Sequence, residues 1–147
     1  MYPHTVTLYT AEVERGADYT ETVTNHITIL RGVLMAASKA DNVRATGLES
    51  ADAVRLYIPF DVEAVDGVTG KPKTYTGPVD FWRANDKGGL WTLTTGGDTF
   101  FIKGEAVETD KDFGYISMRY DDVYVVTKSD MYDFGAEGMP LWEVGAR

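Results

Sequence analysis

The sequence predicts a mostly β fold: one domain over residues 1–147, arranged as a small antiparallel β-barrel or sandwich with one or two short helices and two long loops. Three observations favour this fold class. Apolar and polar residues alternate along several segments, as they do in half-buried strands. Gly-rich turns separate these segments, and no stretch has the spacing of a long amphipathic helix. No repeat or linker divides the 147 residues, a length typical of one domain.

The clearest strand is predicted between residues 54 and 63. Alternate positions there are apolar, so one face of the strand would lie on the core: Val54, Leu56, Ile58, Phe60 and Val62. Pro59 lies on the other face and has no backbone N–H to donate. We therefore expect this strand at the edge of the sheet, or bulged at Pro59.

Further strands are predicted at residues 5–9, 22–34, 90–95, 99–103, 122–128 and 141–144. In the second of these, Gly32 indicates a β-bulge. Gly96-Gly97-Asp98 would form a tight hairpin turn between the third and fourth. Trp91 alternates with Leu93 and is therefore expected in the core.

Short helices are expected at residues 36–40 and 111–118. Two segments, 36–52 and 66–78, are predicted to be long loops. Loops of this length are uncommon inside a compact domain and often carry function, although each could equally be a solvated connection or, for 66–78, a longer hairpin.

The charge balance restricts the partners. The chain has 23 acidic and 14 basic residues, a formal net charge of −9, and no cluster of Lys or Arg. We therefore expect no sequence-specific binding to nucleic acid, because phosphate contacts need a basic surface. An acidic protein can still line a channel through which DNA passes without sticking.

The sequence also excludes several kinds of chemistry. It has no cysteine, and therefore no disulfide, catalytic thiolate or thiolate metal site. Its first residues do not resemble a signal peptide, and its apolar runs are too short to span a membrane, so we expect no membrane association.

No catalytic pattern emerges, and we expect neither enzymatic activity nor a cofactor nor a metal ion. His4 and His26 are interpreted as ordinary strand residues, and no serine has the context of a nucleophile. The segment 67–71 lacks the flanking residues of a phosphate-binding loop. Pairs of acidic residues are interpreted as solvated turn positions, with a carboxylate or metal site as the alternative: Asp110 and Asp112, Asp121 and Asp122, Asp130 and Asp133.

Aromatic residues offer the best candidates for binding. Tyr75, Phe81, Trp82 and Trp91 could form a stacking platform for sugars or bases. Because adjacent strand residues face opposite ways, Phe81 and Trp82 would not both be buried, and an exposed Trp indicates a contact site.

Several short phrases, in order along the chain, carry a family resemblance. They are Tyr2-Pro3-His4-Thr5-Val6-Thr7-Leu8-Tyr9, Ile29-Leu30-Arg31-Gly32-Val33, Leu56-Tyr57-Ile58-Pro59, Gly97-Asp98-Thr99-Phe100-Phe101-Ile102-Lys103-Gly104, Asp122-Val123-Tyr124-Val125-Val126-Thr127, Asp133-Phe134-Gly135 and Trp142-Glu143-Val144-Gly145. This order resembles small prophage-encoded proteins of Gram-positive gut bacteria, which are similar in turn to head–tail joining proteins of long-tailed phages, of the stopper or minor capsid type. Those proteins have His before the Trp, whereas this chain has Leu141.

The resemblance implies a β-barrel virion protein of the head–tail connector, assembled in the bacterial host cytoplasm. It would form a homo-oligomeric ring, contact portal, adaptor or tail terminator proteins, and line the DNA channel passively. Its long loops would reach neighbouring subunits. The candidate partner contacts are Lys39, Arg44, Lys71, Lys73, Tyr75, Trp82 and Trp142.

Two other classes of function stay open. A stand-alone β-domain that binds a protein or sugar without catalysis would have a concave pocket near Tyr75 or Trp82. An enzyme would bring carboxylates together in a cleft and perturb their pKa values.

Overall fold

The fold is described from a computed structural model. It describes residues 2–17, 20–37, 54–95, 99–106, 113–132 and 140–147. These contain the strands β1 (His4–Arg15), β2 (Glu21–Ala37), β3 (Val54–Pro59), β4 (Glu63–Asp66), β5 (Thr74–Tyr75), β6 (Leu90–Trp91), β7 (Thr99–Lys103), β8 (Val123–Tyr132) and β9 (Leu141–Ala146). The described helices are α2 (Pro78–Arg83) and α3 (Phe113–Arg119). The protein is therefore mostly β, as predicted.

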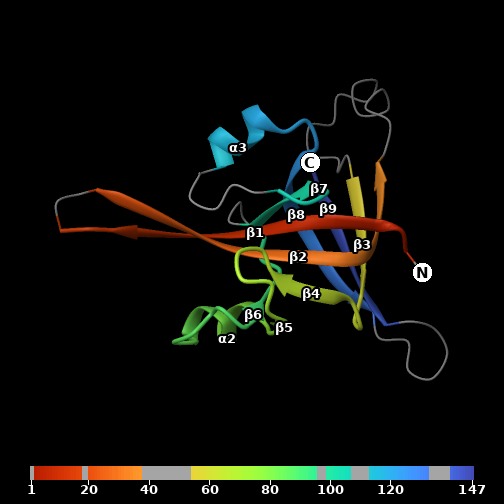
Figure 1. The fold of residues 1–147 in the computed structure, drawn as a ribbon, viewed down its shortest axis with the longest axis horizontal. Helices are drawn as coiled ribbons and strands as arrows, with labels where there is room; N and C mark the ends of the chain where they lie inside the picture. Colours follow the sequence, from red (N-terminus) through yellow and green to blue (C-terminus); the bar gives the residue numbers. More distant parts are fainter. Residues whose placement is uncertain (1, 18–19, 38–53, 96–98, 107–112, 133–139) are drawn as a thin grey trace.

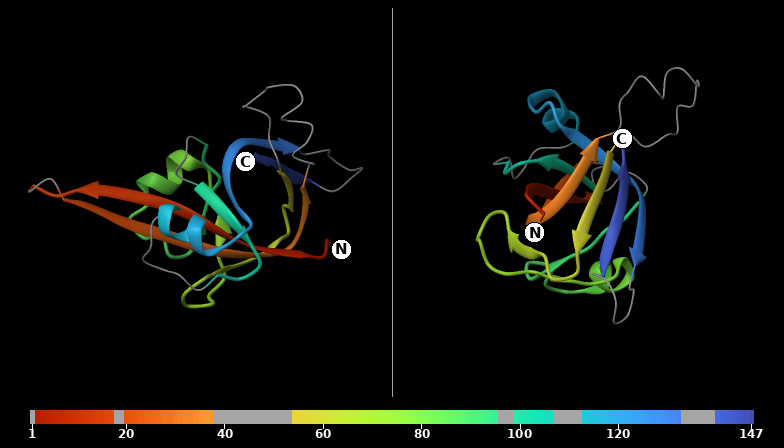
Figure 2. Two further views of the ribbon diagram at one scale, coloured as in Figure 1. Left: turned by 90° about the horizontal axis from the view of Figure 1, so that it is seen from above. Right: turned by 90° about the vertical axis from the view of Figure 1, so that its right-hand side faces the viewer.

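Seven strands form one antiparallel sheet in the order β1-β7-β8-β9-β3-β2-β4. Because β1 also pairs with β2, six of these strands follow one another in a ring, although the sheet is not closed as a barrel. The sheet curls round the core, with α2 and α3 on different sides of it (Figures 1 and 2). A separate pair, β5 and β6, is parallel.

Strand β2 is long enough to serve two neighbours along one edge. Its residues 28–31 pair with β4, and its residues 34–37 pair with β3. Between these stretches Gly32 has a φ of 91°, and the register with β1 shifts there, so that His4 pairs with Val33 but Thr5 pairs with Arg31. Glycine tolerates this left-handed conformation, and the bulge predicted at Gly32 is confirmed.

The sheet buries apolar side chains on both faces. The main core includes Leu8, Leu56, Phe101 and Trp142, and the second core lies on the opposite face beneath Ile116 of α3. Strand β7 contributes to both, because Phe101 belongs to the main core whereas Phe100 and Ile102 belong to the second. Val54, Leu56 and Ile58 are buried as predicted, but the strand ends at Pro59, and Phe60, predicted on the same buried face, is exposed.

The β1–β2 hairpin projects far beyond the rest of the molecule (Figure 1). Strand β1 pairs with β7 only over Val6–Thr10, and β2 pairs with β4 and β3 only from Thr28 onward. Residues 11–15 and 21–25 pair with each other alone among the described strands. We call residues 11–25 the arm. Its five paired residues per strand extend about 17 Å from the body.

Two strand predictions are wrong. Strand β3 is not at an edge and carries no bulge, because it lies between β9 and β2; Pro59 is its last residue, beyond Tyr57, where pairing with β2 ends. The turn predicted at residues 96–98 lies outside the described residues, but the pairing predicted between its two flanking strands is wrong. Strand β7 has β1 on one side and β8 on the other, which leaves no edge for residues 90–95.

The helix and loop predictions have mixed outcomes. Helix α3 confirms the helix expected at 111–118, whereas Ala36 and Ala37 extend β2 because they pair with Arg55 and Val54. The rest of the loop predicted at 36–52 lies outside the described residues. The segment 66–78 is not a free loop, because it contains β5 and the buried Lys73.

Candidate functional site

A pocket of about 540 Å³ opens beside helix α2, and we call it the aromatic pocket. It brings together three of the predicted contact residues from distant parts of the chain: Tyr75 of β5, Trp82 of α2 and Trp142 of β9. The other lining residues are Pro78, Leu93, Thr94, Thr95, Ser129 and Met131.

Aromatic rings packed at an angle to one another form the wall of this pocket. The ring of Trp142 lies 4.4 Å from that of Tyr75 and 4.4 Å from that of Phe60, and Tyr75 also meets the buried Trp91 edge-on at 5.0 Å. Such ring pairs add about 1 kcal/mol each beyond the burial of their surface. Tyr75 and Trp142 are therefore held in place by packing; Tyr75 is half-buried, whereas Trp142 is buried and offers the pocket little of its surface.

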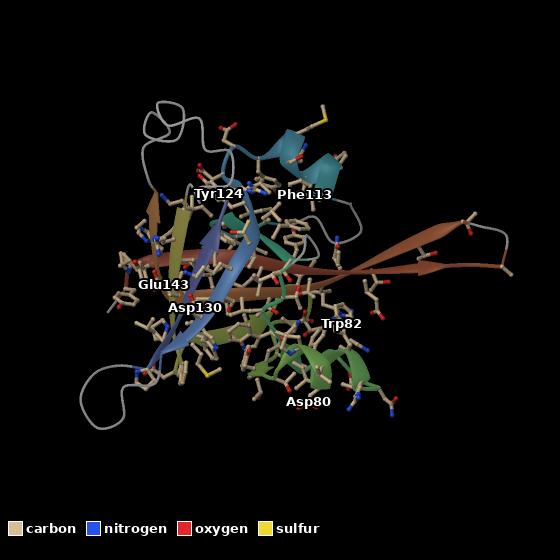
Figure 3. The ribbon with its side chains drawn as sticks, turned by 180° about the vertical axis from the view of Figure 1, so that it is seen from behind. Asp80, Trp82, Phe113, Tyr124, Asp130 and Glu143 are labelled. Carbon is tan, nitrogen blue, oxygen red and sulfur yellow. The ribbon has the colours of Figure 1, made fainter. Side chains whose placement is uncertain are left out.

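Trp82 reaches the pocket because residues 78–83 form a helix, not the strand that the sequence analysis expected. Pro78 stands at the first helical turn with Asp80 beside it, an arrangement that favours a helix start. Phe81 is fully buried, whereas Trp82 is half-buried and lies between α2 and the β1–β2 ribbon (Figure 3). The Gly77-Pro78 pair was the signal that could have revealed this helix.

Within the described part of the chain, two buried polar side chains in or near the pocket wall lack well-placed hydrogen-bond partners. Burial raises the pKa of Tyr75 above its usual value of about 10, and the neighbouring Trp142 indole and Thr92 hydroxyl partly offset this. Yet neither Trp142 Nε1 nor Thr92 Oγ1 has a partner in hydrogen-bonding geometry among the residues that the structure describes. None of the nine lining residues carries a charge or an amide. The pocket can therefore hold an apolar or aromatic group, and its described lining residues offer no charged side chain for a phosphate or a metal ion.

The root of the arm packs against the same helix. His26 Nε2 lies 2.9 Å from Glu12 Oε2 across the hairpin, and the His26 ring meets Phe81 edge-on at 5.5 Å and Trp82 at 6.5 Å. Trp82 therefore contacts His26, the residue that follows the arm, and also lines the aromatic pocket.

The two described lysines among the predicted contacts have different roles. Lys73 is 8% exposed, and its Nζ donates to Ile27 O at 3.0 Å and to Thr28 Oγ1 at 3.2 Å. Its ammonium also lies 3.7 Å from Asp66 Oδ1. Burial lowers the pKa of Lys73, and the charge of Asp66 partly offsets this. Lys73 is thus a structural residue, whereas Lys71 is exposed and could still meet a partner.

Replacing Lys73 by Ala should destabilise the fold by about 1 to 2 kcal/mol, because the Ile27 carbonyl and the buried Thr28 hydroxyl lose their donor and Asp66 loses its ion pair. The matched variant Lys71→Ala should change the free energy of unfolding by less than about 0.5 kcal/mol. Urea unfolding of both proteins measures the difference. Equal stabilities of the two variants would contradict the buried position of Lys73.

The carboxylates do not converge on one site in the described part of the chain. Asp121 and Asp122 are exposed, and Asp130 pairs with Lys128 at 3.2 Å. Burial alone would raise the pKa of Asp66, but hydrogen bonds from Thr69 and the charge of Lys73 outweigh it and hold that pKa below its usual range. No group of three His, Asp or Glu side chains among the described residues is placed to hold a metal ion. Lys39, Arg44, Asp110, Asp112 and Asp133 lie outside the described residues.

Comparison with known families gives one assignment over residues 1–147. The chain belongs to DUF6751, a family of unknown function. No curated protein and no solved structure matches it. Neither of the helices described in this family member has the length and apolarity that a membrane crossing requires.

Proposed function

We propose that this protein is a non-catalytic structural component of a phage or prophage virion, placed in the head–tail connector, where it docks onto portal, adaptor or tail proteins. The short sequence phrases that resemble head–tail joining proteins support this proposal. So does the net charge of −9, which suits a protein beside a DNA channel. The proposal includes a homo-oligomeric ring.

The projecting arm is the observation that carries this proposal. A two-stranded ribbon on its own is at best marginally stable in water, because it buries little apolar surface. Here five residue pairs extend past the last strand of the body, with no further strand beside them in the described part of the chain. In an assembly, a neighbouring protein would cover such an arm and stabilise it.

The aromatic pocket favours a second candidate function, that of a stand-alone domain that binds a protein partner. Its rigid wall of Tyr75 and Trp142 and its uncharged lining suit an apolar side chain or a proline-rich segment. A sugar is less well matched, because the lining residues offer hydroxyls but no charged or amide group.

Deletion of the gene from an inducible prophage tests the connector role. We expect filled or emptied heads and free tails in electron micrographs, with the titre of infectious particles reduced at least a thousandfold. The full-length gene should restore joined particles. A gene in which Asn-Gly replaces residues 11–25, joining the paired residues Thr10 and His26, should not restore them.

The shortened protein keeps every core residue that the structure describes, so its thermal unfolding serves as the control for folding. Normal joined particles in the absence of the gene would contradict the connector role.

A further inference from the structure

The outer edge of strand β1 in the arm is an open strand edge. Residues 6–10 of β1 pair with β7 on that side, but the pairing ends at Thr10. For residues 11–15 the described strands offer only β2, on the other side. The N–H and C=O groups along such an edge can pair with an extended segment of another protein.

The charge of the arm indicates what kind of segment would pair with its open edge. Residues 11–25 include Glu12, Glu14, Asp18 and Glu21 against one basic residue, Arg15. The arm thus carries a net charge of −3 within a chain whose total is −9. A second copy of this chain would bring like charge to the edge, whereas a basic segment would gain Coulomb energy and associate faster.

We propose that the open β1 edge of the arm pairs with an extended, Lys- or Arg-rich segment of a different virion protein, and not with a second copy of this chain. The inference rests on the proposed connector function and adds the chemistry of the partner. The segment would join the arm as a third strand, which also gives the ribbon the additional strand that it needs for stability.

The test is a titration of the purified protein with the portal and adaptor proteins encoded by the same prophage. The double variant Glu14→Gln/Glu21→Gln should bind about tenfold more weakly, because two charge pairs are lost. Its affinity should also fall less steeply with rising salt. The control Asp61→Asn/Asp121→Asn removes two exposed acidic residues outside the arm and should bind like the natural protein.

Hydrogen exchange of the backbone amides supplies a second measurement, one that electrostatic attraction without strand pairing would not change. In the complex, backbone amides within residues 11–15 should exchange at least tenfold more slowly than in the free protein, because a new strand would accept their hydrogen bonds. Arm amides that exchange equally fast in the complex would overturn strand pairing.

The outcomes separate this inference from the proposed function. Binding that is equally strong for the arm variant and the control overturns the inference and leaves the connector role standing. Stronger self-association of the arm variant than of the control also overturns it, because the occupant would then be a second copy. Absence of binding to both virion proteins overturns the connector role itself, and the inference with it.

Discussion

The variant Leu56→Asp is expected not to fold. Leu56 is completely buried at the centre of β3, where it pairs with Met35 of β2 and Val144 of β9. A carboxylate there would have neither water nor a partner, and the loss of the leucine alone would cost about 2 to 5 kcal/mol. Since small domains have only about 5 to 15 kcal/mol of stability in total, the unfolded state should dominate. Circular dichroism would show loss of the β signal and of cooperative melting.

Ile58→Asp should have the same effect, because Ile58 occupies the same face two residues along and is also fully buried. Arg55→Gln is the matched control: Arg55 is exposed on the opposite face of the same strand, and its replacement should leave the fold intact. A cooperatively folded Leu56→Asp protein would contradict the register of β3.

The variant Gly67→Ala is expected to destabilise the protein by about 2 to 3 kcal/mol. A Cβ atom at position 67 would overlap the Cγ2 methyl of Ile27 and lie 3.1 Å from its Cβ. Ile27 is 3% exposed in the second core, and its branched side chain has little rotamer freedom with which to move away. The hydrogen bond from Gly67 N to Ile27 O holds the two residues together. The midpoint of urea unfolding measures the loss.

Gly89→Ala provides the control, because a Cβ atom at Gly89 meets nothing within 4 Å. Its stability should stay within about 0.5 kcal/mol of the natural protein. If Gly67→Ala were as stable as this control, the close approach of residue 67 to β2 would be wrong.

Strands could be predicted from the sequence where apolar and polar residues alternate. Alternation located β1, β2, β3, β8 and β9, because a strand with a buried face repeats its apolar residues every second position. The bulge at Gly32 followed from the freedom of glycine to adopt positive φ. Helix α3 was also foreseen.

Tertiary contacts decided the elements that were missed. Strands β5 and β6 contain two residues each, too few for any period, and they pair across the intervening helix α2. Trp91 was rightly placed in the core, but nothing local indicates that its strand would run parallel to β5. Pro59 does not place β3 at an edge, because the pairing of β3 with β2 ends at Tyr57. A proline two residues further on therefore costs no hydrogen bond to β2.

The sequence indicated several residues of the candidate site, but not that they would meet in one pocket. Tyr75 and Trp82 were singled out as aromatic residues able to meet a partner, since exposed aromatic residues are common in contacts. Trp142 was named only through the family resemblance, and it is buried in the main core. The meeting of these three residues in one pocket depends on the ring of strands, which brings β9 beside β5. The structural role of Lys73 depends on its neighbours Ile27 and Thr28, more than forty residues earlier in the chain. The projection of residues 11–25 from the body could not be predicted either, because their apolar and polar residues alternate as in any other strand.

The central claim, that this protein docks onto other virion proteins through its arm, is tested most directly by measuring mass in solution. Light scattering would compare the natural protein alone, the natural protein mixed with the portal and adaptor proteins, and the protein with Asn-Gly in place of residues 11–25 in the same mixture. We expect a ring or a stoichiometric complex for the natural protein in the mixture and its loss for the shortened one. A natural protein that stays monomeric beside both partners would contradict the claim.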